Sequence, residues 1–263
     1  DLDNIESVFA AFEIGRLIKR LAGMSSEEIE LLLISIRKLI LKTLEETIKY
    51  PVRGKKIYPN ESYDSFAKLV IDLNSRKGNS CSIITFNYDL ALDYALNFNN
   101  HRADYCFSEI AKPGHTPLMK LHGSLNWARC SKCGEIIPWD IHAYFQKYHF
   151  PFLEDLDFVH LDFASKLLSL ASGLEHCGQH VAPDPVIIPP TWNKTEYHQV
   201  LETVWRRAAL ELSNAENIFI SGYSLTETDS FFRYLFAMGS IGKTRIKRFW
   251  VFDPDEQGVV RPR

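Results

Sequence analysis

The chain has 263 residues, of which 46% are hydrophobic and 24% charged, and its formal net charge at pH 7 is -3. This composition is typical of a globular protein with one large domain or two small ones, and it excludes a low-complexity chain. The small net charge provides no overall attraction to nucleic acid or to an anionic membrane, so neither is expected as a partner. The sequence shows no apolar run of the roughly 18 residues that cross a bilayer, and no signal-peptide pattern at its acidic start. We therefore expect a cytoplasmic protein.

Helical periodicity dominates the first 77 residues. The spacing of apolar residues predicts helices over residues 4–22, 25–50 and 62–76. Ser25 is a typical helix cap, and the acidic residues Glu27 and Glu28 favour the first turn of the same helix. Pro51 is expected to end this helix, because proline cannot continue the hydrogen-bond ladder.

Strands and helices alternate in the remainder of the chain. Strands are predicted at residues 83–86, 117–121, 186–188, 217–221 and 248–252, and helices at 90–98, 196–212 and 226–238. This alternation, with strands that form continuous apolar runs, predicts an α/β fold with a doubly wound parallel sheet. The sheet core is expected to comprise 78–124 and 185–263, following a helical region at 1–77. The stretch 125–184 is too long for a simple crossover, so we expect it to form a small inserted module.

Polar side chains follow two of the predicted strands. Asn87 and Asp89 come after the first strand, and His122 comes directly after the second. Because ligands bind at the carboxyl ends of strands in open α/β sheets, we expect these side chains to meet over a ligand. An amide can donate and accept hydrogen bonds at once, and a histidine can transfer a proton near neutral pH. The alternatives are that Asn87 and Asp89 only cap the next helix and that His122 is a hydrogen-bonded loop residue.

The cysteines indicate a metal site. Five cysteines without a signal peptide favour metal binding or free thiols over a disulfide framework. Cys130 and Cys133 form one pair separated by two residues, and Cys177 and His180 form a second. Two such pairs can close a tetrahedral zinc site with no open position, so the zinc would be structural. His176 is an alternative fourth ligand, and a reduced thiol pair without metal is the alternative interpretation.

These motifs and their order resemble those of sirtuins. The segment T-F-N-Y-D at 85–89 looks like the sirtuin T-x-N-x-D motif, and L-H-G at 121–123 looks like the catalytic His-Gly pair. The sequence S-G-Y-S-L at 221–225 resembles the later Gly-x-Ser-Leu turn. Tyr88, I-I-P-P-T at 187–191 and S-L-x-x-T-D at 224–229 look closer to the sirtuin-like NAD hydrolases of prokaryotic anti-phage defence than to deacylases. The resemblance covers roughly residues 1–255 and implies a Rossmann-like domain.

The resemblance also implies roles for individual residues. Asn87 would position the nicotinamide ribose or the attacking water, and His122 would be the general base. The cofactor-binding residues that it implies are Thr85, Asn87, Asp89, Gly222, Tyr223, Ser224, Asp229 and Asp253, the last beside the adenosine portion. Sirtuins carry a zinc module after the His-Gly pair, where Cys130 and Cys133 lie, although His180 stands in place of a fourth cysteine.

One sirtuin motif has no counterpart. A Gly-rich turn of the G-A-G-x-S type cradles the NAD pyrophosphate in the family, but Gly15 and Gly23 lie within helical patterns and do not form such a loop. The segment from Asn4 to Phe9 resembles the sequence downstream of that turn. We therefore expect the turn to lie upstream of this chain, and the fragment alone to bind NAD+ weakly.

Three functions compete at the level of sequence. The first is an NAD+ glycohydrolase that cleaves the nicotinamide–ribose bond and depletes NAD+ during abortive infection in a prokaryotic cytoplasm. Such an activity must be off by default, which implies a homo-oligomer, a regulatory partner or fused C-terminal domain, and a phage-derived trigger. The second is an NAD-dependent protein deacylase, which needs a groove for an extended peptide. The third is a non-catalytic module that binds NAD or ADP-ribose or that serves assembly, although retention of Asn87 and His122 argues against it.

Overall fold

The computed structural model describes residues 5–141, 144–145, 156–161, 174–181, 185–188, 201–223, 230–239, 241–242 and 244–252. The helices are α1 (Ile5–Ile18), α2 (Ser26–Thr47), α3 (Glu61–Ser75), α4 (Ala91–Phe98), α8 (Glu202–Asn214) and α9 (Ser230–Gly239). The longer strands are β1 (Tyr50–Arg53), β3 (Ile83–Thr85), β4 (Arg102–Asp104), β5 (His115–Lys120), β7 (Trp127–Arg129), β8 (Ile136–Pro138), β13 (Asn217–Ser221) and β14 (Arg248–Phe252). Two-residue strands are β2 (Lys56–Ile57), β6 (Gly123–Ser124), β9 (Phe158–Val159), β10 (Glu175–His176), β11 (Gln179–His180) and β12 (Val186–Ile187).

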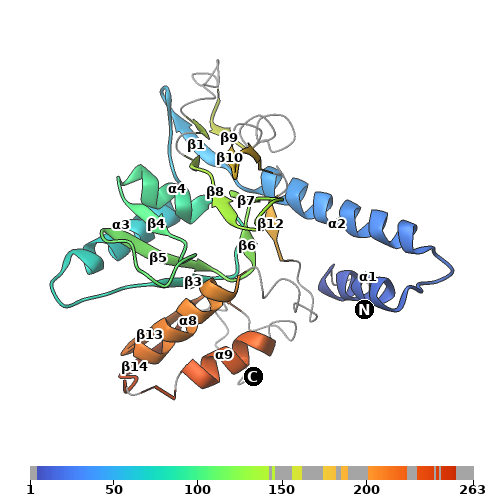
Figure 1. The fold of residues 1–263 in the computed structure, drawn as a ribbon. Helices are drawn as coiled ribbons and strands as arrows, with labels where there is room; N and C mark the ends of the chain where they lie inside the picture. Colours follow the sequence, from blue (N-terminus) through green and yellow to red (C-terminus); the bar gives the residue numbers. More distant parts are fainter. Residues whose placement is uncertain are drawn as a thin grey trace, which may run out of the picture.

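The first two helices form an arm that projects from the body of the molecule (Figure 1). The predicted start of α2 is confirmed: the Ser25 hydroxyl accepts a hydrogen bond from the Glu28 N–H, and the Glu28 carboxylate accepts one from the Ser25 N–H. The predicted end is wrong by one turn, because α2 stops at Thr47 and Tyr50 begins β1. Proline disfavours helical geometry at the residue before it, so the helix has to end before Tyr50 and not at Pro51 itself.

A parallel sheet forms the centre of the body. β5 lies between β3 and β4 and runs parallel to both, with Thr85 of β3 opposite Lys120 of β5. Successive residues of β5 face opposite sides of this sheet: Leu118 packs with α3 and α4, and Met119 packs with α8. Helices thus cover both faces, and the predicted α/β class with a Rossmann-like, doubly wound parallel sheet is confirmed.

The strands near the C-terminus pair differently from one another. β13 and β14 form a second parallel pair, with Asn217 opposite Arg248 and Ser221 opposite Phe252. The prediction that residues 186–188 belong to the parallel sheet is wrong, because β12 pairs antiparallel with β6 next to His122. Pairing partners depend on contacts between distant residues, so an apolar run alone cannot identify them.

The inserted stretch 125–184 contains short antiparallel pairs. β7 pairs with β8, and β10 pairs with β11, so each forms a hairpin. β9 instead pairs with β1, which ties this stretch to the N-terminal region. In the described ranges, no helix is long and apolar enough to cross a membrane.

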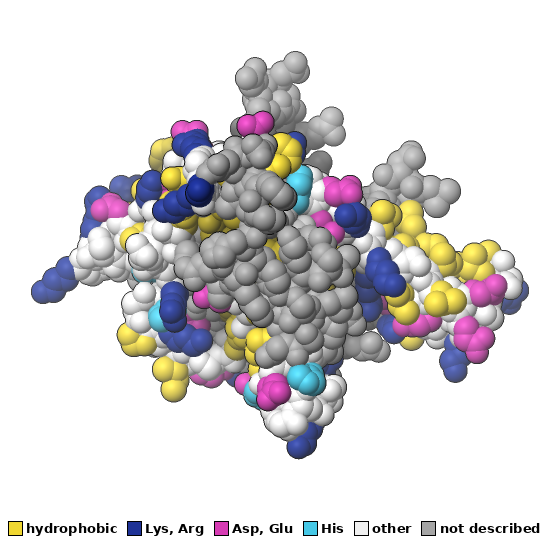
Figure 2. Space-filling view, turned by 90° about the horizontal axis from the view of Figure 1, so that it is seen from above, with side chains coloured by type: hydrophobic (Ala, Val, Ile, Leu, Met, Phe, Trp, Pro, Cys, Tyr) yellow, Lys and Arg dark blue, Asp and Glu magenta, His cyan; other side chains and the backbone are white. Residues whose placement is uncertain are grey.

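Two large apolar clusters hold the body together. One contains residues of β1, α4 and the inserted stretch, including Tyr50, Tyr94 and Tyr144. The other contains residues of β5, β7 and α8, including Leu121, Trp127 and Trp205. The arm has a small separate cluster around Ile29 and Leu33. Hydrophobic side chains lie exposed along the arm in Figure 2, and those on α1 and α2 include Leu17, Ile18, Leu31 and Leu39.

Candidate functional site

The loop between β3 and α4 carries the predicted Asn87 and Asp89. The backbone N–H of Asn87 donates to the Thr85 hydroxyl oxygen at 3.1 Å, which turns the chain directly after β3. The Asn87 side chain is exposed. One carboxylate oxygen of Asp89 accepts a hydrogen bond from the Ala91 N–H at 2.9 Å. This contact forms a turn directly before α4, whose N-cap residue is Leu90 and has no side-chain cap hydrogen bond, so the alternative that Asp89 caps the helix is not confirmed.

His122 lies against both neighbours of Asn87. Its imidazole is buried, at 5% exposure, and its ring centroid is 4.8 Å from that of Phe86 and 6.0 Å from that of Tyr88. Phe86 also stacks on Tyr223, with centroids 4.6 Å apart and an interplanar angle of 7°. Phe86, after β3, thus contacts both the histidine that follows β5 and Tyr223, which follows β13. These rings lie at the carboxyl ends of parallel strands, where ligands bind in open α/β sheets.

The backbone around His122 is fixed by β12. The His122 carbonyl accepts a hydrogen bond from the Ile188 N–H at 2.7 Å, and the Tyr88 hydroxyl donates to the Ile188 carbonyl at 2.6 Å. Gly123 has a φ of +87°, and a Cβ atom at this position would lie 2.0 Å from the Val186 carbonyl oxygen. Glycine is therefore required directly after the histidine for a steric reason.

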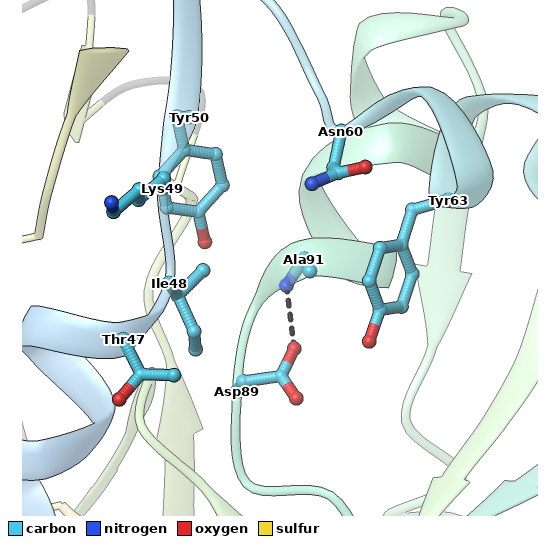
Figure 3. A pocket seen from close by; sticks show the side chains of 8 residues that line it. All are labelled: Thr47, Ile48, Lys49, Tyr50, Asn60, Tyr63, Asp89 and Ala91. Carbon is cyan, nitrogen blue, oxygen red and sulfur yellow. Dashed lines mark hydrogen bonds between the residues drawn. The ribbon is translucent and has the colours of Figure 1, made fainter. Parts of the chain in front are cut away.

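A pocket of about 260 Å³ lies beside this loop and is shown in Figure 3. It is lined by Thr47, Ile48, Lys49, Tyr50, Asn60, Tyr63, Asp89 and Ala91, so it brings together the end of α2 and the starts of α3 and α4. In Figure 3, the hydroxyl groups of Tyr50 and Tyr63 and the carboxyl group of Asp89 point into the space between these elements. A small polar ligand in this pocket would have hydrogen-bonding groups of the protein on more than one side.

Burial changes the titration of the groups around the pocket. Burial raises the pKa of the Asp89 carboxyl, although the nearby Lys120 opposes this shift. Burial and then the Asp89 charge raise the pKa of the Tyr63 hydroxyl. The Tyr50 hydroxyl has a pKa well above its ordinary value for the same reasons, and it has no hydrogen-bond partner in the part of the chain that the structure describes. Tyr50 therefore stays a neutral phenol with a hydrogen-bond donor to spare.

The predicted metal site assembles from four residues of the inserted stretch. The thiol sulfurs of Cys130, Cys133 and Cys177 and a ring nitrogen of His176 all lie within 4.8 Å of one another. Ligand atoms of a tetrahedral zinc with Zn–S bonds of about 2.3 Å would be roughly 3.8 Å apart, so this set fits zinc after a small contraction. The Cys133 N–H, and then the His176 ring, lower the pKa of the Cys130 thiol to about 6. Neighbouring Cys133, followed by burial, raises the pKa of Cys177 to about 11.

The fourth member of this group is His176, the alternative ligand, and not His180. His176 is opposite Gln179 in the β10–β11 hairpin, whereas His180 is opposite Glu175. Adjacent cross-strand pairs face opposite sides of a hairpin, so only one of the two histidines can face the cysteines. The Gln179 amide donates to the hydroxyl of Ser131, which lies between Cys130 and Cys133, at 3.0 Å. The face of the hairpin that carries Gln179 and its partner His176 is therefore the face toward the cysteines.

Several predicted ligand contacts stay predictions. Ser224, Asp229 and Asp253 lie outside the described residues. Gly222 has a φ of +63° and is exposed at the end of β13, next to the Tyr223 ring.

Sequence reasoning missed a hydrogen-bonded set of polar residues beside the site. They are the buried Lys120, Asp93 and Asn126 and the half-buried Tyr105. The signal was present, because Lys120 interrupts the otherwise apolar run 117–121 directly before the Leu-His-Gly sequence. A lysine inside a buried strand requires a buried partner.

Comparison with known proteins adds a sequence match to this geometry. Residues 81–148 match the family described as SIR2-like domain. No curated protein matches the chain.

Solved structures of sirtuins show a distant likeness. The chain is 18% identical to a mutant Sir2 homologue in complex with ADP-ribose, with a TM-score of 0.37, and covers 61% of that chain with 81% of its own length. It is 18% identical to a Sir2 homologue–NAD complex, with a TM-score of 0.38, and covers 62% of that chain with 85% of its own. It is 15% identical to a Sir2–p53 peptide–NAD+ complex, with a TM-score of 0.36, and covers 84% of that chain with 92% of its own length. The chain thus spans less than two thirds of the length of the first two structures.

The matched segment includes β3, the loop with Asn87 and Asp89, α4, β5 and His122. These are the elements that bring the loop and the histidine together. Residues 81–148 are therefore similar to the family described as SIR2-like domain.

Proposed function

We propose that this protein is an NAD+ glycohydrolase that cleaves the bond between nicotinamide and ribose. One observation supports the proposal above all: the buried His122 ring contacts Phe86 and Tyr88, the two residues that flank Asn87. A proton-transferring group and an amide on a facing loop are the groups that hydrolysis of a ribosyl bond requires.

Both residues have a defined part in the proposed reaction. As the bond to nicotinamide breaks, the ribose ring gains oxocarbenium character and a water molecule attacks its anomeric carbon. The Asn87 amide holds a ribose hydroxyl or this water, since it can donate and accept at once. His122 acts as general base and accepts a proton from the attacking water or from the ribose hydroxyl. Its burial, at 5% exposure, keeps bulk solvent away from the ring.

We further propose that the pocket in Figure 3 receives the nicotinamide end of the substrate. The carboxamide group of nicotinamide carries donors for a carboxylate and an acceptor for a hydroxyl. Asp89 offers the second oxygen of its carboxyl group, and the half-buried Tyr63 offers its hydroxyl. Because Asp89 also accepts the N–H of Ala91, the first residue of α4, one residue links the position of the loop to the position of the ligand.

In this proposal the Cys130–Cys133–His176–Cys177 group holds a structural zinc ion. Four protein ligands complete a tetrahedron and leave no position for water or substrate. The ion would stabilise the β7–β8 and β10–β11 hairpins, which come together at this group.

The biological role that we propose is NAD+ depletion in anti-phage defence. It rests on the resemblance of the sequence around Tyr88 and of residues 187–191 and 224–229 to defence-associated NAD hydrolases. An enzyme that consumes NAD+ must be inactive without a trigger, so we propose control by self-association or by a partner.

The proposal is tested by measuring nicotinamide release from NAD+ without any acylated peptide, with the full-length protein and with its trigger present. His122→Ala and Asn87→Ala are expected to lower the rate at least about 100-fold, which is the lower range for loss of general-base catalysis. His115→Ala is the matched control, because His115 begins the same strand β5 at its opposite end. It should leave the rate unchanged.

Two other results would reject the proposal. If NAD+ were consumed only together with an acylated peptide, the protein would be a deacylase. If NAD+ or ADP-ribose bound without turnover under every condition, the site would be a binding module.

A further inference from the structure

Lys120 is a charged side chain in an unusual place. It is the last residue of β5, two residues before His122, and it is only 1% exposed. Its ammonium group forms an ion pair with Asp93 of α4 at 2.9 Å, and the Asp93 side chain is buried as well. Burying two charges costs more solvation free energy than an apolar pair of similar size would. The position of this pair therefore calls for an explanation beyond stability.

The ammonium group has a second partner in the loop that carries Asn87. Lys120 Nζ donates a hydrogen bond to the backbone carbonyl of Asp89. The preceding carbonyl, that of Tyr88, accepts a hydrogen bond from the Leu125 N–H at 3.0 Å, and the Ser124 hydroxyl oxygen lies 3.4 Å from it. Residues 86–89 belong to no helix or strand. Donors from the chain segment on either side of His122 thus set the course of this loop.

The partner of Lys120 is itself held in place. The Tyr105 hydroxyl donates to the other oxygen of Asp93 at 2.6 Å. Tyr105 in turn accepts a hydrogen bond from the Asn126 amide at 2.9 Å. The Asn126 side chain also accepts one from the Ser124 hydroxyl, at 2.8 Å. The chain of contacts returns to the same loop, because the Ser124 hydroxyl oxygen, whose single hydrogen goes to Asn126, lies 3.4 Å from the Tyr88 carbonyl oxygen.

We propose that Lys120 is a positioning residue that holds the 86–90 loop, and with it Asn87, in register with His122. It acts through the Asp89 carbonyl and does not contact the substrate. Asp93, Tyr105 and Asn126 fix the direction of its ammonium group. This inference rests on the proposed hydrolase function, which it extends from the two reacting side chains to the group that aligns them. Alignment matters because a displacement of about 1 Å can lower a rate on the order of 100-fold.

A pair of charge-removing substitutions separates positioning from charge compensation. Lys120→Met alone leaves the Asp93 carboxylate buried without its cation. An unpaired buried charge destabilises the fold, so this single variant would lose stability whether or not Lys120 positions the loop. In Lys120→Met/Asp93→Asn neither charge remains, and the melting temperature should recover toward that of the parent protein. The Asp89 carbonyl still lacks its donor in the double variant. We therefore expect its kcat for NAD+ hydrolysis to stay about 100-fold low with KM changed far less.

Lys68→Met is the matched control, because Lys68 forms an exposed ion pair with Asp64 on α3. It should leave both kinetic constants unchanged. If the double variant regained the parent kcat together with the parent stability, Lys120 would only neutralise Asp93 and the proposal would be wrong.

A second measurement does not depend on turnover. Amide hydrogen exchange of residues 86–90 should be faster in the double variant, whereas exchange in β13 should not change. Unchanged exchange in the 86–90 loop would overturn the positioning role. If exchange in the loop became faster but the parent protein never released nicotinamide, the hydrolase function would fail while the structural role of Lys120 stood.

Discussion

Single residues at this site make more than one contact. The Asp89 carboxylate accepts the N–H of Ala91, the first residue of α4, and also lines the pocket beside the loop. One carboxyl group has two oxygens and can serve both. His122 likewise contributes its carbonyl to the Ile188 N–H while its ring faces Phe86.

The raised pKa of Asp89 predicts how stability depends on pH. Burial is the main cause, so the folded protein binds the Asp89 proton more tightly than the unfolded chain does. As pH rises from the ordinary value of 3.8, the unfolded state releases this proton first and the folded state loses stability relative to it. The loss is complete once the pH has passed the folded-state pKa.

Asp89→Asn removes this dependence, and it keeps an oxygen that accepts the Ala91 N–H. The free energy of unfolding of the variant, relative to the parent protein, should therefore rise as pH increases through this window. Urea titrations at a series of pH values measure the difference. A difference that is constant with pH, or that falls, would contradict the assigned burial of the charge.

At the scale of elements, alternation along a two-residue strand decides which histidine faces the cysteines. Spacing in the sequence favoured His180, since it forms a second pair with Cys177. In the hairpin, however, the turn residues Cys177 and Gly178 both have positive φ, at 54° and 72°, which is typical of a tight two-residue turn. This turn puts Cys177 beside His176 and directs His180 to the other side.

This geometry predicts different outcomes for two histidine substitutions. In the proposed zinc site, His176→Ala removes one of four ligands, so the variant is expected to bind zinc less tightly than the parent protein and to melt at a lower temperature. His180→Ala lies on the same hairpin and is the matched control, with zinc content and melting temperature unchanged. Metal analysis and thermal unfolding of both variants provide the comparison. Zinc loss in His180→Ala alone would show that the hairpin has the opposite orientation.

At the scale of the whole molecule, the arm and the body have separate apolar cores. Ile29 and Leu33 of α2 pack with Phe12 and Leu21, and none of these residues belongs to the two clusters of the body. The body clusters join strands and helices that are far apart in the chain, and Leu121 lies in one of them. The first half of α2 is therefore expected to unfold independently of the sheet.

Two leucine truncations test this independence. Leu33→Ala should cost about 2–5 kcal/mol locally and speed amide exchange in α1 and the first half of α2, while β5 stays protected. Leu121→Ala should cost a similar amount but destabilise the body as a whole. Native-state hydrogen exchange distinguishes local from global opening. Equal loss of protection in β5 for both variants would show that the arm and body unfold as one unit.

The sequence by itself determined the features that depend on neighbouring residues. It predicted the capped start of α2, the positions of β3, β5, β13 and β14, and the places of Asn87 and His122 directly after β3 and β5. Periodicity and capping act over a few residues, so they can be identified without the fold. Only the tertiary structure decided the antiparallel pairing of β12, the choice of His176 and the buried contacts of Lys120. Each of these depends on which distant residue supplies the partner, and a hydrogen bond or an ion pair forms only where folding brings both groups together.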